Sequence, residues 1–81
     1  MLKRLSELKP GEEGVIVKVE GRGPAVRRMA DMGLLPGVKV RVLRRAPLGD
    51  PVELEVKGYN LSLRRDEARL MLVEVRRSEG L

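Results

Sequence analysis

Residues 38–56 read VKVRVLRRAPLGDPVELEV, and this segment gives the clearest indication of the fold. On both sides of a central loop, apolar side chains occupy every second position, which is the pattern of two half-buried β-strands. The alternate positions are mostly basic in the first strand and acidic in the second, so antiparallel pairing gains about 0.2 to 1 kcal/mol for each charge pair. The stretch therefore predicts two paired strands whose inward side chains are Val38, Val40, Val42, Val52, Leu54 and Val56.

A helix is predicted directly upstream of these two strands. Over residues 24–32, apolar residues recur at helical spacing, and Pro24 occupies the first turn, where its missing N–H costs nothing. Gly33 can take the left-handed conformation that ends a helix, which would fold Leu34 back onto Met29. The helix is therefore expected to end in a glycine cap of the Schellman type.

Two further elements are predicted near the N-terminus. Apolar residues alternate over residues 15–19, which predicts a strand with Val15, Val17 and Val19 facing inward. Residues 2–8 carry a leucine at every third position and predict a short helical turn. We expect this turn to cover one end of the core.

The C-terminal half completes the predicted architecture. Residues 61–63 indicate a short strand, residues 65–68 a single helical turn and residues 70–75 a final strand. Antiparallel strands this short expose few edges when the sheet closes on itself, so we predict an all-β fold, a small β-barrel of about five antiparallel strands with a short inserted helix. One domain is expected over residues 1–76, followed by a loose C-terminal tail over residues 77–81.

The composition argues against catalysis. The sequence contains no histidine, no cysteine and no threonine, so the usual general base and the usual thiolate metal ligands are missing. Gly21-x-Gly23 lacks the third glycine and the Lys-Ser/Thr pair that phosphate-binding loops use. We therefore predict that the protein is not an enzyme, has no catalytic residues and holds no cofactor.

Adjacent carboxylates are the only candidates for a metal site. Glu12-Glu13 and Asp66-Glu67 could together ligate a hard cation if the fold brought the two pairs together. Nothing in their spacing requires this arrangement. No metal ligand is therefore assigned from the sequence.

The net charge of +5 favours an acidic partner, which could be a nucleic acid, an anionic membrane surface or an acidic face of a protein. Single-stranded nucleic acids are bound by aromatic stacking, and Tyr59 is the only aromatic residue. A charge-driven nucleic-acid-binding barrel is the second functional hypothesis. No apolar run is long enough for a signal peptide or a membrane span, so we expect a cytoplasmic protein that reaches a membrane only through a partner.

Two segments of the sequence resemble the ferrous iron transport protein A (FeoA) family. They are Met-Gly-Leu-Leu-Pro-Gly at residues 32–37 and Ala-Pro-Leu-Gly-Asp-Pro at residues 46–51, and the similarity extends over most of the chain. The resemblance implies an SH3-like barrel with a helix inserted after its first strand. A related domain forms the C-terminal part of iron-dependent regulators of the diphtheria toxin repressor type, and this chain looks like a stand-alone version of it.

The same resemblance implies a function. FeoA proteins are small cytosolic accessory proteins of ferrous iron uptake, and they are thought to bind the membrane transporter FeoB, whose cytosolic part includes a GTP-binding domain. The family label of iron transport and transition metal ion binding therefore implies only an indirect link to Fe²⁺ for a chain without histidine or cysteine. We expect the protein to be recruited to the inner membrane by this partner.

The two FeoA-like segments supply the candidate partner-binding residues, which are Leu34, Leu35, Pro36, Gly37, Pro47, Leu48, Gly49 and Asp50. Both segments also have a purely structural interpretation. Glycines permit sharp turns, Leu34 and Leu35 could fill core or cap positions, and Asp50 could cap its own turn through an Asx-type hydrogen bond. Self-association through loops or sheet edges is a further alternative.

Overall fold

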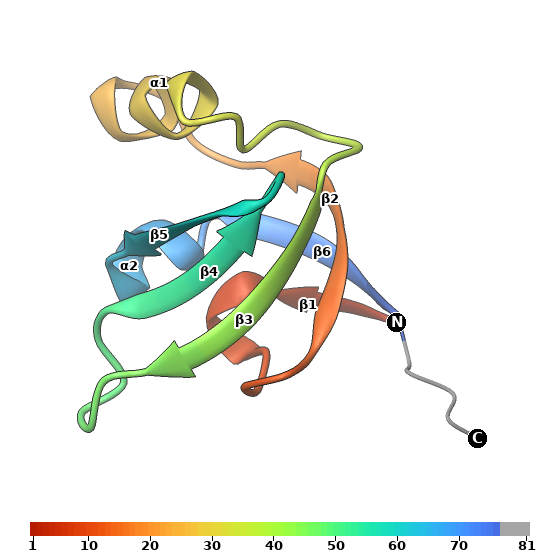
Figure 1. Ribbon diagram of the computed structural model, residues 1–81. Helices are drawn as coiled ribbons and strands as arrows, with labels where there is room; N and C mark the ends of the chain where they lie inside the picture. The colour runs from red at the N-terminus through yellow and green to blue at the C-terminus, as the bar shows by residue number, and fades with distance from the viewer. Residues whose placement is uncertain (77–81) are drawn as a thin grey trace.

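The computed structural model describes residues 1–76 and shows one six-stranded antiparallel sheet accompanied by short helices (Figure 1). The strands are paired in the order β1-β6-β2-β3-β4-β5. Their bounds are Leu2–Arg4 (β1), Glu13–Val19 (β2), Lys39–Arg45 (β3), Val52–Val56 (β4), Tyr59–Leu63 (β5) and Met71–Arg76 (β6). The helices are α1 (Pro24–Asp31), α2 (Arg65–Ala68) and the 3-10 helix η1 (Leu5–Glu7). The predicted tail over residues 77–81 lies outside the described residues.

The hairpin predicted from residues 38–56 is confirmed as β3 and β4. Five of its six predicted inward residues are fully buried: Val40, Val42, Val52, Leu54 and Val56. The sixth, Val38, is partly buried against the core. The predicted charge pairs also form, because Arg41 lies opposite Glu55, and Arg44 Nε donates a 2.6 Å hydrogen bond to Glu53. The strand order is therefore supported by apolar burial on one face and by opposite charges on the other.

The predicted orientation of β2 was wrong. Ile16 is the buried residue, whereas Val17 faces outward and is 47% exposed. The register between β2 and β6 shifts between Ile16 and Lys18, which marks a β-bulge. Because a bulge adds one residue to the strand, Val19 returns to the core side beyond it.

The N-terminal segment contains a strand that the helical spacing did not predict, which makes six strands and not five. β1 pairs with β6, and the chain forms the short helix η1 only afterwards. Leu5 and Leu8 are fully buried, as a turn covering the core requires, whereas Leu2 is exposed. The sheet is strongly curved (Figure 1), and β1 and β5 are the two ends of its hydrogen-bonded series, so closure into a barrel stays a prediction.

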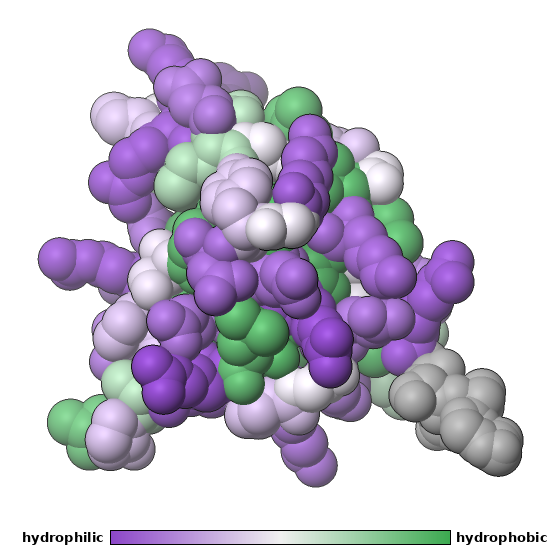
Figure 2. Space-filling model, viewed as in Figure 1, coloured by the Kyte–Doolittle hydropathy of each residue, from purple (hydrophilic) through white to green (hydrophobic). Residues whose placement is uncertain are grey.

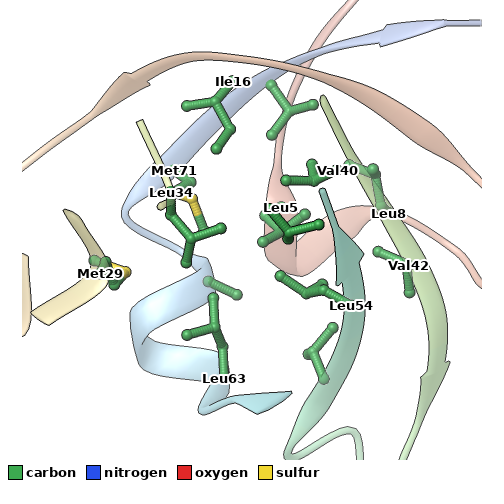
Figure 3. Packing of buried hydrophobic residues seen from close by; sticks show 14 residues of the cluster. Leu5, Leu8, Ile16, Met29, Leu34, Val40, Val42, Leu54, Leu63 and Met71 are labelled. Atoms are coloured by element: carbon green, nitrogen blue, oxygen red, sulfur yellow. The ribbon is translucent and has the colours of Figure 1, made fainter. Parts of the chain in front are cut away.

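The core is aliphatic, as the absence of Phe and Trp predicted, and its side chains converge on one interior (Figure 3). They come from the strands, from η1 and its following residue, from α2, and from α1 and its cap. The buried members are Leu5, Leu8, Ile16, Met29, Leu34, Val40, Val42, Val52, Leu54, Val56, Leu63, Ala68, Met71 and Val73. Nearly every element therefore depends on the same small core.

Helix α1 ends in the predicted glycine cap. Gly33 has a φ of 90°, its N–H donates to the Ala30 carbonyl at 2.9 Å, and the Leu34 N–H donates to the Met29 carbonyl at 3.0 Å. This pair of hydrogen bonds defines the Schellman motif. Met29 and Leu34 are both buried, so the cap attaches α1 to the core.

We expect Gly33→Ala to lower the free energy of unfolding by about 1 to 2 kcal/mol, because a Cβ atom disfavours the left-handed conformation. Gly33→Asn should cost less, since asparagine tolerates this conformation better. Urea unfolding followed by circular dichroism measures both losses. An alanine variant as stable as the parent chain would contradict this explanation of the cap.

Candidate partner-binding surface

An apolar groove of about 280 Å³ lies between α1 and β2, and we call it the α1–β2 groove. Its lining residues are Val17, Val19, Val26, Ala30, Leu35 and Pro36, together with Leu34 and Lys18. Three local features produce it. The β-bulge places Val17 outside the core, the glycine cap sends Leu34 inward, and Leu35 follows at 45% exposure.

The groove contains part of the predicted site. Leu34, Leu35 and Pro36 all line it, whereas Gly37 lies beside a separate, more polar hollow on the outer side of β3. Val17 is a groove residue that the sequence analysis missed. Its signal was the run Val15-Ile16-Val17, because three successive β-branched residues in one strand cannot all face the core.

The second predicted segment, the β3–β4 loop, lies at the other end of β3. β3 is seven residues long, so it separates the two segments by roughly 23 Å at about 3.3 Å per residue. Figure 1 shows α1 and the loop at opposite ends of the molecule. The structure therefore does not bring Pro47, Leu48, Gly49 and Asp50 together with the groove.

Asp50 has a structural role that differs from the predicted one. Its Oδ1 accepts a 3.0 Å hydrogen bond from the backbone N–H of Arg65, the first residue of α2. The carboxylate thus satisfies a free N–H at a helix start and ties the β3–β4 loop to α2. The Asx-type cap predicted for Asp50 was wrong.

Polar contacts hold α1 on the sheet and so keep the groove formed. The guanidinium of Arg28 in α1 pairs with Glu67 in α2, and Glu67 is nearly buried. The same carboxylate accepts a 3.0 Å hydrogen bond from the Arg64 N–H. The hydroxyl of Tyr59 in β5 donates to the carbonyl of Met32, the residue that follows the last turn of α1. The groove is therefore already ordered in the free protein, which would lower the cost of binding a partner there.

The adjacent carboxylates do not converge on a metal site. Glu12 accepts a hydrogen bond from the Lys9 N–H at 2.8 Å, Glu13 lies 3.7 Å from Lys39, and Asp66 lies 3.6 Å from Arg69. Among residues 1–76, no three carboxylates are close enough to hold a metal ion. The condition under which the two pairs could form a metal site is therefore not met among the described residues.

One carboxyl group has a shifted pKa. A 2.6 Å hydrogen bond from the Arg4 guanidinium lowers the pKa of Glu20 below its ordinary value, and the positive charges of Arg4 and Lys18 act in the same direction. Glu20 lies at the solvent-exposed surface, away from the α1–β2 groove. The shift therefore reflects a surface ion pair and gives no sign of acid–base chemistry.

A curved six-stranded sheet with an inserted helix and an ordered apolar groove defines a small binding module. The chain belongs to the FeoA domain family, whose family model matches residues 3–75. FeoA proteins are non-enzymatic accessory proteins, which confirms the prediction that this chain is not an enzyme. None of the helices within residues 1–76 has the length and apolar character needed to cross a bilayer.

Two relatives show how the domain occurs elsewhere. A protein of Porphyromonas gingivalis that fuses Fe(2+) transport protein A to the Fe(2+) transporter FeoB is 47% identical over 72 residues, which are 89% of this chain and 8% of that protein. A putative Fe(2+) transport protein A of Methanocaldococcus jannaschii is 33% identical over 86% of this chain and 83% of its own length. The chain therefore spans a small part of the first relative and most of the second.

Solved structures support the fold. The NMR structure of a FeoA-like protein from Clostridium acetobutylicum is 32% identical, with a TM-score of 0.86 over 95% of this chain and 90% of that one. The zinc complex of FeoA from Stenotrophomonas maltophilia, described as an SH3 domain protein, is 28% identical to this chain. Its TM-score is 0.76 over 91% of this chain and 89% of that one. The fold is therefore SH3-like. The regulator IdeR of T. acidophilum shares it, with a TM-score of 0.81 at 22% identity over 93% of this chain and 34% of IdeR.

Proposed function

We propose that this chain is an accessory protein of ferrous iron uptake that binds the cytosolic part of a FeoB-type transporter. The observation that carries the proposal is the Porphyromonas gingivalis relative, in which a domain 47% identical to this one belongs to the same polypeptide as FeoB. Fusion holds two domains at a high effective concentration, which promotes binding between them. Homologues of two fused domains are therefore good candidates for binding each other as separate chains. In this proposal the protein works in the cytoplasm and reaches the inner membrane through FeoB.

The α1–β2 groove is the surface that we assign to this interaction. Val17 and Leu35 are each nearly half exposed, and they lie beside the buried Leu34 in a groove with a largely apolar lining. In protein interfaces, a few residues that are fully desolvated in well-packed pockets supply most of the binding energy. Of the residues predicted from the sequence, the proposal retains Leu34, Leu35 and Pro36 as contacts.

Titration calorimetry with the cytosolic part of the cognate FeoB tests this function. We expect saturable binding with a negative heat-capacity change, because apolar surface is buried when the groove is filled. The same titration with single-stranded RNA tests the alternative of a basic nucleic-acid-binding barrel, which predicts affinity that falls steeply as salt rises. Absence of binding to FeoB over a broad concentration range would contradict the proposal.

A further inference from the structure

The β3–β4 loop carries the most exposed large apolar side chain among residues 1–76. Leu48 is 89% exposed at the tip of this loop. Two backbone hydrogen bonds close the loop beneath it, from Gly49 N to the Ala46 carbonyl at 2.7 Å and from Ala46 N to the Pro51 carbonyl at 3.1 Å. The leucine is thus held away from the body of the molecule, and Figure 2 shows an apolar tip at the end where Figure 1 places the loop.

Arg44 and Arg65 lie near the base of this tip. Arg44 precedes the loop at the end of β3, and the Arg65 guanidinium lies 3.7 Å from the position that a Cβ atom on Gly49 would occupy. Arg64 lies next to Arg65, and both are exposed. Within the described part of the chain, no carboxylate lies within 4.0 Å of the guanidinium of Arg64 or Arg65.

Three carboxylates lie in the same region. Glu53 and Asp66 are paired with arginines, whereas Asp50 contacts a backbone N–H and keeps its negative charge. Glu53 accepts from Arg44 at 2.6 Å, Asp50 accepts from the Arg65 backbone N–H at 3.0 Å, and Asp66 lies 3.6 Å from Arg69. Arg45 is also occupied, since its guanidinium donates to the carbonyls of Ser6 and Leu8. The guanidinium groups without a carboxylate neighbour at this end are therefore those of Arg64 and Arg65. Arg44 is exposed but is already paired with Glu53.

We propose that the tip formed by Leu48, with Arg44, Arg64 and Arg65 behind it, binds an anionic lipid surface. The shape favours a membrane over a protein, because the tip is convex and its apolar end projects beyond the cations. A bilayer has this layering, with apolar chains beneath a plane of anionic headgroups, whereas a protein partner would need a matching pocket. One leucine and three cations give weak, reversible binding.

This inference is independent of the proposed FeoB interaction and compatible with it. The tip and the α1–β2 groove lie at opposite ends of β3, roughly 23 Å apart along seven residues at about 3.3 Å each. Binding of the tip to a lipid surface therefore leaves the groove open to a protein. In a complex with a membrane transporter, the second contact would raise the effective affinity of both.

Co-sedimentation of the full chain with vesicles tests the inference. We expect binding to phosphatidylcholine vesicles that contain about 30% phosphatidylglycerol, little binding to pure phosphatidylcholine, and weakening as salt rises. Leu48→Ser should lower partitioning onto the anionic vesicles about fivefold to tenfold, because the inserted side chain is lost. The double variant Arg64→Gln/Arg65→Gln should lower it by a similar factor.

Leu35→Ser is the matched control, since it removes an exposed leucine at the opposite end and should leave vesicle binding unchanged. Circular dichroism of each variant establishes that it is folded. Three results would overturn the inference. They are no binding of the parent chain to anionic vesicles at low salt, equal losses of vesicle binding for Leu48→Ser and Leu35→Ser, and vesicle binding of Leu48→Ser equal to that of the parent chain. If Leu48→Ser instead weakens binding to the FeoB cytosolic part with vesicle binding intact, the tip is a protein contact.

Discussion

Leu35→Asp is expected to weaken binding to the cytosolic part of FeoB by about 100-fold, which corresponds to about 2.7 kcal/mol. Leu35 lines the α1–β2 groove beside Val17, Leu34 and Pro36, so the new carboxylate would lose its hydration in a largely apolar contact when the partner binds. The folded state should be retained, because Leu35 is 45% exposed in the free protein. Titration calorimetry measures the loss.

The chain offers a matched control for this prediction. Leu48→Asp makes the same chemical change at an exposed leucine in the β3–β4 loop, far from the groove. Its affinity for FeoB should stay within about threefold of the parent chain, the scatter expected for residues outside an interface. Equal losses in the two variants, or no loss for Leu35→Asp, would show that the groove is not the docking surface.

Gly14→Ala is expected to destabilise the fold by about 3 kcal/mol and to lower Tm by roughly 12 to 24 °C. Gly14 lies in β2 where the strand packs closely against β6. A Cβ atom on it would lie 2.4 Å from the Glu74 carbonyl oxygen and 2.5 Å from Val73 Cγ1. The Val73 side chain can rotate, but the carbonyl oxygen moves only if β2 and β6 separate. Thermal unfolding followed by circular dichroism measures the effect.

Ser62→Ala is the control for this second prediction. Ser62 is an exposed residue of β5, so its removal should change the free energy of unfolding by less than about 0.5 kcal/mol. If Gly14→Ala is as stable as Ser62→Ala, the close approach of β2 and β6 is not a requirement of the fold. That outcome would also weaken the strand order on which the position of the groove depends.

Local sequence patterns predicted the elements whose physical cause is local. The β3–β4 pairing follows from alternation with opposite charges, and the end of α1 follows from Gly33 between Met29 and Leu34. The predicted orientation of β2 was wrong because the bulge near Val17 is set by its pairing with β6, a strand that is distant in sequence. β1 was missed for the same reason, since its pairing with β6 is not local.

The candidate site shows the same limit. Leu34, Leu35 and Pro36 line one groove, as their adjacency in sequence suggests, and their role in binding stays a prediction. Val17 could not be added without knowing that α1 packs over β2. Leu48 was grouped with them by resemblance to a family, and only the length of β3 reveals that it belongs to the other end of the molecule.

An amide-resolved NMR titration of the chain with the cytosolic part of the cognate FeoB tests the central claim most directly. We expect the amides of residues 17–19, 26–30 and 34–35 to shift or broaden on binding, because these residues border the α1–β2 groove. The amides of residues 46–50, in the β3–β4 loop, should stay unchanged. Changes centred on that loop, or saturating binding with the groove amides unaffected, would contradict it.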